Sequence, residues 1–237
     1  MAQRKYVLDN LGEIKIVKRR GAKNLALRVN PSGEVRISMP LGLPYIVGLA
    51  FAKRQQRWII RNKSRHALKL LTNGSRIGKA HRLTIIQNPI IAKPASIKIV
   101  HAPNCIEVRT NLSLDNKSLQ NKILKACEAA IIREAKQLLP QRLNYLAEKY
   151  KLSFKEVGIK KLSARWGSCS PSGNITLNCF LMQLPWELID YVLVHELTHL
   201  DHPNHSQGFW QSLEQKLPNT KQLRKQLRGY RPCLQPV

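Results

Sequence analysis

The first half of the chain alternates between apolar and polar residues, and this pattern predicts β-strands. Residues 13–18 and 25–29 alternate in this way, and so does the run 35–39 that follows the turn 30–33, Asn-Pro-Ser-Gly. Alternating runs on either side of a Pro/Gly turn are typical of a hairpin. A single helix is predicted over 45–71. Further short strands are expected at 82–86, 96–100 and 105–109.

Helical periodicity dominates the second half of the chain. A long helix is predicted over 119–150, in which Pro140 should cause a kink or an interruption. Another helix should begin near Pro185 and end before Pro203, because proline suits a first turn and disrupts a helix interior. A last helix is predicted over 207–217. Between the long helix and Pro185, short strands are expected at 158–162, 165–170 and 175–178.

These patterns together predict an α+β fold in two parts. A polar stretch at 111–116 marks the junction between them. The first part, residues 1–115, should be β-rich and basic, and the second, residues 116–237, should be mainly helical with a small sheet. A chain of 237 residues, 43% of them hydrophobic, is long enough for one large domain or two small ones.

Composition narrows the class of protein. No run of about 18 apolar residues occurs, and residues 1–6 lack the apolar segment of a secretory signal, so we expect a soluble, cytoplasmic protein without a membrane partner. The five cysteines are odd in number and form no CxxC pair. A disulfide framework and a cysteine-rich zinc ribbon are therefore both disfavoured.

The formal net charge is +26, which raises affinity for polyanions and makes nucleic acid a possible partner, although no recognition motif supports it. The charge is unevenly distributed. Residues 1–115 hold 22 Lys and Arg against 5 Asp and Glu, whereas residues 166–215 hold no Lys or Arg and 5 Asp and Glu. The absence of fixed positive charge would favour a divalent cation there. The basic residues 221–228 are expected to form a solvated face.

The segment His195-Glu196-Leu197-Thr198-His199 carries the chemistry. Residues four apart lie on one side of a helix, so both imidazoles can bind one zinc ion. Glu196, one residue on, is close enough to reach a metal-bound water without being a ligand, and it can act as the general base. An apolar helix that buried these groups without partners would be costly, which argues against a chance occurrence of the motif.

Zinc needs a third protein ligand. His202 stays near the helix, where it would be almost collinear with the first two histidines. His205 lies beyond Pro203, where the chain has turned, and is the preferred ligand. The carboxylate of Glu214 on the next helix remains an alternative.

Four longer motifs resemble the YgjP-like metal-dependent hydrolases, small zincins related to the SprT-like and WLM peptidases. The matching runs are 165–170, 173–178, 190–200 and 204–210, with weaker likeness at 27–29, 33–38 and 58–59. The resemblance implies Zn²⁺ bound by His195, His199 and His205, with Glu196 as catalyst in a zincin-like second part. True metzincins are disfavoured, because their glycine position is His202 here and no methionine follows the motif.

Residues Arg165, Trp166, Gly167 and Ser168 precede or begin a probable edge strand and are candidates for substrate binding. Arg165 could bind an anionic group or stabilise an oxyanion, or form a structural ion pair. We expect Trp166 and Trp210 in the core. Asn178 is expected either to orient a ligand or to cap a turn.

Three functions are compatible with these residues. The favoured one is a peptidase-like zinc hydrolase acting on a peptide or protein. The second is a metal-dependent phosphohydrolase acting on nucleotides or another anionic small molecule, which the +26 charge and Arg165 would favour. The third is a nucleic-acid-associated protein with a structural zinc.

Overall fold

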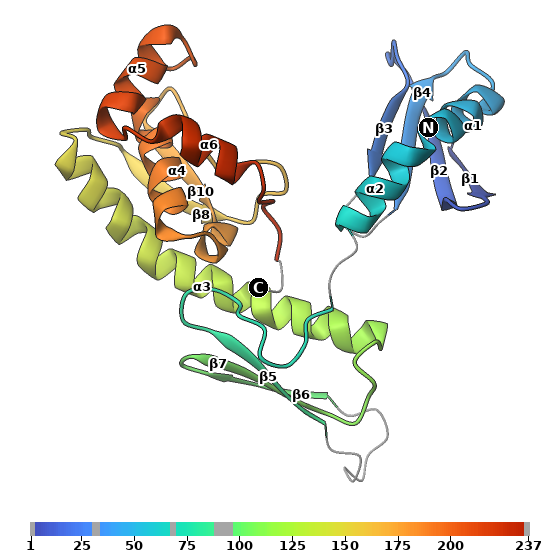
Figure 1. Cartoon of the computed structure of the whole chain (residues 1–237), viewed down its shortest axis with the longest axis horizontal. Helices are drawn as coiled ribbons and strands as arrows, with labels where there is room; N and C mark the ends of the chain where they lie inside the picture. The colour runs from blue at the N-terminus through green and yellow to red at the C-terminus, as the bar shows by residue number, and fades with distance from the viewer. Residues whose placement is uncertain (1–2, 30–33, 67–69, 88–96, 235–237) are drawn as a thin grey trace. The chain divides into compact units, whose positions relative to one another are not determined.

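The computed structural model describes residues 3–29, 34–66, 70–87 and 97–234 (Figure 1). The chain divides into two compact units, Met1–Lys69 and Leu70–Val237. The predicted junction at 115/116 therefore lies inside the second unit. The reason is packing, since Leu83 and Val108 from the strands before the junction share one apolar core with Ile123 and Ala130 after it.

The first unit is a four-stranded sheet covered by two helices. The strands are β1 (Gln3–Leu8), β2 (Gly12–Arg19), β3 (Ala26–Val29) and β4 (Val35–Pro40), in the order β1-β2-β4-β3. β2 and β4 are parallel, whereas β3 pairs with β4 as the predicted antiparallel hairpin, whose turn lies outside the described residues. Every second residue of β4 is buried (Val35, Ile37 and Met39), as its alternation predicts.

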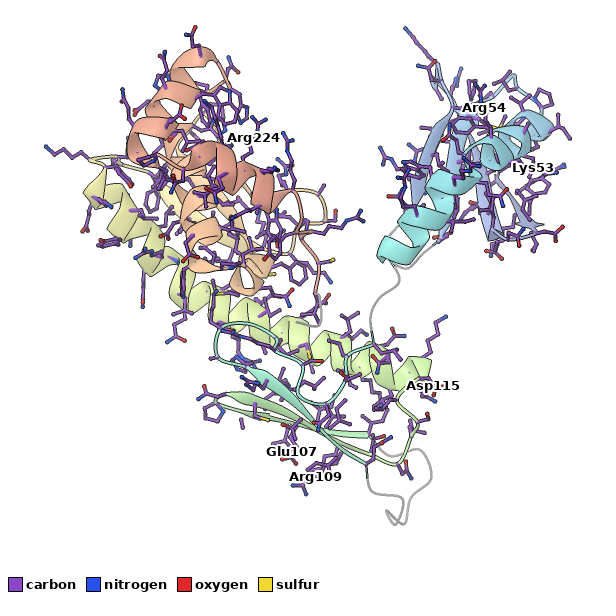
Figure 2. All side chains as sticks on the ribbon, in the orientation of Figure 1. Lys53, Arg54, Glu107, Arg109, Asp115 and Arg224 are labelled. Atoms are coloured by element: carbon purple, nitrogen blue, oxygen red, sulfur yellow. The ribbon has the colours of Figure 1, made fainter. Side chains whose placement is uncertain are left out.

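The single helix predicted over 45–71 is wrong. The chain forms α1 (Tyr45–Arg54) and α2 (Gln56–His66), with a break at Gln55, and residues 67–69 lie outside the described residues. The break lets α1 pack against β4 while α2 packs against β3. α1 contributes Ala52 to the apolar core of the unit and α2 contributes Ile59. Basic side chains such as Lys53 and Arg54 occupy the last turn of α1 (Figure 2).

The second unit contains two small sheets joined by one long helix, α3 (Lys117–Lys149) (Figure 1). The first sheet has the order β5-β7-β6, with β5 (Arg82–Gln87), β6 (Ile97–Ala102) and β7 (Cys105–Thr110) at the predicted positions. Asn116 begins α3 by accepting hydrogen bonds from the backbone N–H groups of Ser118 and Leu119. Pro140 lies inside the helix without interrupting it.

The second sheet has the order β8-β10-β9, with β8 (Glu156–Lys160), β9 (Gly167–Cys169) and β10 (Asn174–Asn178). β10 is central, because it pairs in parallel with β8 and antiparallel with β9. The chain continues through the 3₁₀ helix η1 (Cys179–Gln183), α4 (Trp186–Thr198), α5 (Gln207–Lys216) and α6 (Thr220–Leu227). The fold is thus α+β, as predicted.

α4 is the central helix of the second unit. It contacts α3, α5, α6 and β9, so it is enclosed on most sides. This surrounding explains why apolar residues occur almost all round it, including Leu188, Val192, Leu193 and Leu197. Of the helices that the described residues form, none combines the length and the apolar character needed to cross a membrane.

Candidate metal centre and active site

Three imidazoles converge at the end of α4. His195 and His199 lie one helical turn apart, with ring centroids separated by 5.0 Å. α4 ends at Thr198, and the chain then turns so that His205, just before α5, faces back toward the helix. The Nε2 atoms of His205 and His195 are 3.1 Å apart, and one nitrogen from each of the three rings lies within 4.8 Å of the others.

The chemistry of these donors fits a divalent metal. Nitrogen ligands about 2.0–2.1 Å from a tetrahedral zinc ion are about 3.3 Å from one another, close to the observed separation of the two Nε2 atoms. The Nδ1 of His199 donates a hydrogen bond of 3.0 Å to the carbonyl of His202, which leaves its Nε2 as a lone-pair donor. His202 therefore supplies a backbone carbonyl to this cluster and not an imidazole.

The surroundings of His195 and His205 lower the pKa of both imidazoles and so favour their neutral form. Burial, reinforced by the charges of His199 and His205, lowers the pKa of His195 to about 3. Burial and the charge of His199 also lower the pKa of His205. Since only neutral imidazole binds a metal, these shifts favour ligation at neutral pH. The buried Nδ1 of His195 has no hydrogen-bond partner among the described residues.

Two aromatic residues of α5 support the imidazoles. The ring of Phe209, which is fully buried, lies 4.9, 4.6 and 4.8 Å from the rings of His195, His199 and His205. Trp210 stacks on His205 with a centroid distance of 5.6 Å. Trp210 is partly buried and packs against the main apolar core, as expected, and it also supports the edge of the imidazole cluster.

Glu196 projects from α4 toward β9. Its side chain is 6% exposed, and burial raises its pKa to about 7, against the opposing effect of Arg165. The carboxylate packs directly on the backbone of Gly167, where a Cβ atom would lie 2.7 Å from Oε1. Glycine at this position therefore makes room for the carboxylate between α4 and the edge strand.

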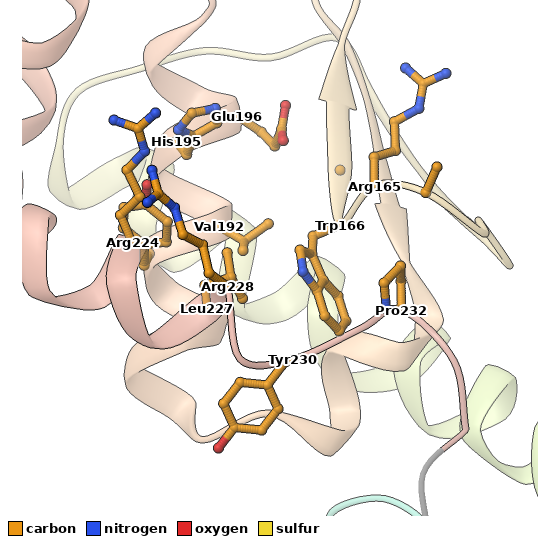
Figure 3. Close-up of a pocket in the computed structure, with 13 residues that line it drawn as sticks. Arg165, Trp166, Val192, His195, Glu196, Arg224, Leu227, Arg228, Tyr230 and Pro232 are labelled. Atoms are coloured by element: carbon orange, nitrogen blue, oxygen red, sulfur yellow. The ribbon is translucent and has the colours of Figure 1, made fainter. Parts of the chain in front are cut away.

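A cavity of about 440 Å³ opens beside Glu196 and His195 (Figure 3). Three segments line it: the chain entering β9, the face of α4 that carries Val192 and Glu196, and the chain from α6 onward. The predicted residues Arg165, Trp166 and Gly167 all line this cavity. Ser168 is not among the lining residues; it lies within β9 and pairs with Thr176 of β10.

Asn178 fixes the segment that carries Arg165 and Trp166. Its fully buried amide donates hydrogen bonds of 2.7 and 2.8 Å to the carbonyls of Leu162 and Arg165. Its Oδ1 accepts from the backbone N–H of Phe180 at the start of η1, as the predicted cap would. Asn178 touches no imidazole in these bonds, so it positions the cavity wall and not a metal ligand.

The sequence did not predict that side chains from α6 and the segment after it line the cavity. The basic residues of 221–228 are exposed, as expected for a solvated face, but Arg224 and Arg228, together with Tyr230, also line the cavity. The four-residue spacing of the two arginines was the available signal, because it puts both on one side of a helix. The alternative ligand Glu214 lies outside the imidazole cluster, and its Oε1 is 3.7 Å from the Nζ of Lys221.

Known protein families and solved structures show which proteins this chain resembles. The sequence model of the YgjP-like metallopeptidase domain matches residues 23–230. Among solved structures, the metallopeptidase zymogen abylysin of Pyrococcus abyssi is similar at 25% identity over 39% of this chain and 93% of its own, with a TM-score of 0.36. The zymogen jannalysin of Methanocaldococcus jannaschii is similar at 18% identity over 38% and 94%, with a TM-score of 0.35.

A search of curated proteins gives no match. The family match covers most of the chain, including the imidazole cluster, Glu196 and the cavity. It also runs through both compact units, beginning before β3 and ending after α6. The chain is a metal-dependent, peptidase-like hydrolase that belongs to the YgjP-like metallopeptidase family.

Proposed function

We propose that this protein is a zinc-dependent peptidase in which His195, His199 and His205 hold the metal and Glu196 is the general base. The observation that carries the proposal is the convergence of three imidazole nitrogens beside a buried carboxylate on the wall of a cavity. An all-imidazole donor set suits zinc. When bound, the metal would polarise the scissile carbonyl and lower the pKa of a water molecule.

Glu196 has the properties that a base in this reaction needs. Its carboxylate takes a proton from the attacking water and passes it to the leaving amine. Burial raises the pKa of this carboxylate above its ordinary value, which favours uptake of a proton from the attacking water. Its contact with Gly167 fixes the carboxylate beside the edge strand. A substrate held along that strand would therefore present its peptide bond close to the base.

β9 supplies the surface for an extended peptide. In the sheet order β8-β10-β9, only one side of β9 is paired with another described strand. The free backbone groups of such an edge can hydrogen-bond to a peptide that adds as a further strand. The family match favours a peptide or protein substrate in the same way. It lends no support to the phosphohydrolase or to the nucleic-acid-associated protein with a structural zinc.

The test is Glu196→Gln. The variant should keep the zinc content of the native protein, measured by elemental analysis, while peptide hydrolysis falls by about 10²- to 10⁴-fold. Glu214→Gln is the matched control, because Glu214 is an exposed carboxylate outside the imidazole cluster and should leave both quantities unchanged. Full peptide turnover by Glu196→Gln would contradict the proposal. So would phosphate release from nucleoside triphosphates without any peptide cleavage.

A further inference from the structure

Arg224 and Arg228 bring two guanidinium groups to the cavity beside Glu196. Neither forms an ion pair with any carboxylate in the part of the chain that the structure describes, and both are exposed. The lining contains one carboxylate, Glu196, and that group faces Gly167. Two positive charges therefore lie on the rim of the cavity without a protein counter-charge.

Local structure orients this pair. Arg224 lies in α6, and Arg228 follows one turn later as the residue that ends the helix, so both point to the same side. Arg224 is held over the ring of Trp210, with its Cζ 4.4 Å from the centroid. Figure 3 shows both guanidinium groups on the His195 side of the cavity, across from Arg165 and Trp166.

The other basic residues of α6 show that this is not a uniformly charged surface. Lys221 and Lys225 occupy the same helix but do not line the cavity, and Lys221 lies near Glu214. Among the basic residues 221–228, only Arg224 and Arg228 line the cavity, and their guanidinium groups present planar forks matched to a carboxylate. The remaining wall is largely apolar, with Trp166, Val192 and Leu227 among its residues.

We propose that Arg224 and Arg228 form a subsite for a carboxylate of the peptide substrate, next to the bond that is cleaved. This inference rests on the proposed peptidase function. The carboxylate comes either from an Asp or Glu side chain or from the C-terminus of the peptide. In the first case the protein is an endopeptidase selective for acidic sequences, and in the second it is a carboxypeptidase.

The experiment uses the full-length, zinc-loaded protein and a set of paired peptides. In the first arm both termini are blocked and each pair differs by Glu against Gln at one position. In the second arm each peptide is offered with a free or an amidated C-terminus. The ratio of kcat/KM within a pair is measured for the native protein, for Arg224→Gln and Arg228→Gln, and for the matched control Lys225→Gln, which removes a charge from α6 outside the cavity.

We expect one position, or the free C-terminus, to raise kcat/KM about five- to tenfold, as a charge-assisted contact between partly solvated groups would. The two arginine variants should bring that ratio close to one, whereas Lys225→Gln should preserve it. Arg228→Glu should shift the preference toward a Lys-containing peptide. A merely structural role would lower the rates for both members of a pair equally.

Two negative results are distinguishable. If the native protein cleaves peptides in a Glu196-dependent way but shows no preference for a carboxylate in either arm, the subsite is wrong and the peptidase function stands. If the preference for a carboxylate is unchanged in both arginine variants, the subsite is likewise wrong and the peptidase function stands. If the zinc-loaded protein cleaves no peptide of the set, the proposed function fails and the subsite fails with it.

Discussion

Replacement of Gly167 by alanine tests whether the position of the Glu196 carboxylate matters for activity. A Cβ atom at residue 167 would lie 2.7 Å from Oε1, 2.8 Å from Cγ and 2.9 Å from Cδ of Glu196. Ordinary contacts of a Cβ atom begin at 3.4 Å. The carboxyl end of the side chain must therefore move by about 0.7 Å, the difference between 3.4 and 2.7 Å.

A movement of this size should change the free energy of unfolding little but the rate of hydrolysis strongly. The end of one side chain can rotate without displacing backbone, so we expect a loss of about 1 kcal/mol in the free energy of unfolding, the low end of the cost of overpacking. A reacting group misplaced by about 1 Å can cost about 100-fold in rate. We therefore expect kcat/KM to fall by about 10- to 100-fold, or about 1.4–2.7 kcal/mol of transition-state stabilisation.

The assay is peptide hydrolysis by the zinc-loaded variant, with zinc content and thermal unfolding measured on the same sample. Gly158→Ala is the control, because Gly158 lies on β8 of the same sheet and a Cβ there would meet nothing within 4 Å. Native activity in Gly167→Ala would refute the requirement for this carboxylate position. A loss of zinc together with activity would show that the substitution disturbs the imidazoles instead.

Other substitutions test the supports of the site. Asn178→Ala should lower the free energy of unfolding by about 2–4 kcal/mol in denaturant titrations, because the carbonyls of Leu162 and Arg165 lose their amide donor; native stability would show that these bonds contribute little. Phe209→Leu should weaken zinc binding about tenfold in chelator competition, since its ring contacts all three imidazoles; unchanged affinity would contradict that support. Arg224→Met should strengthen zinc binding several-fold at low salt, because it removes a positive charge that opposes a cation nearby; weaker binding would contradict this reasoning.

Hydrophobic periodicity predicted most elements because most of them bury one face. It missed β1, in which no residue is buried, since an edge strand with this exposure leaves little alternation to detect. It also merged α1 and α2, because neither glycine nor proline marks Gln55 and the break depends on which strand each helix contacts. Periodicity also failed to predict α6, whose apolar residues Leu223 and Leu227 are only partly buried.

The residues of the candidate site also differ in how far the local sequence predicts their positions. His195 and His199 are set by helical spacing, so local sequence predicts their common face and places Glu196 one residue beyond the first of them. The contact between Glu196 and Gly167 depends on how α4 packs against β9, and the position of Arg224 depends on how α6 packs against α4. No local pattern encodes these distances, because they come from contacts between segments that are far apart in the sequence.

The charge distribution now has a structural interpretation. The fifty residues 166–215, which hold no Lys or Arg, contain the whole imidazole cluster and the helix that carries most of it. The arginines that line the cavity come from the segments on either side, Arg165 before β9 and Arg224 and Arg228 from α6. Because the proposed metal ligands and the arginines of the proposed subsite lie on separate elements, an arginine can be replaced without removing a ligand. Replacing Arg228 should therefore change the preference for an acidic peptide without removing a proposed ligand, whereas replacing Arg224, whose charge acts on His195 and His205, should change metal affinity as well.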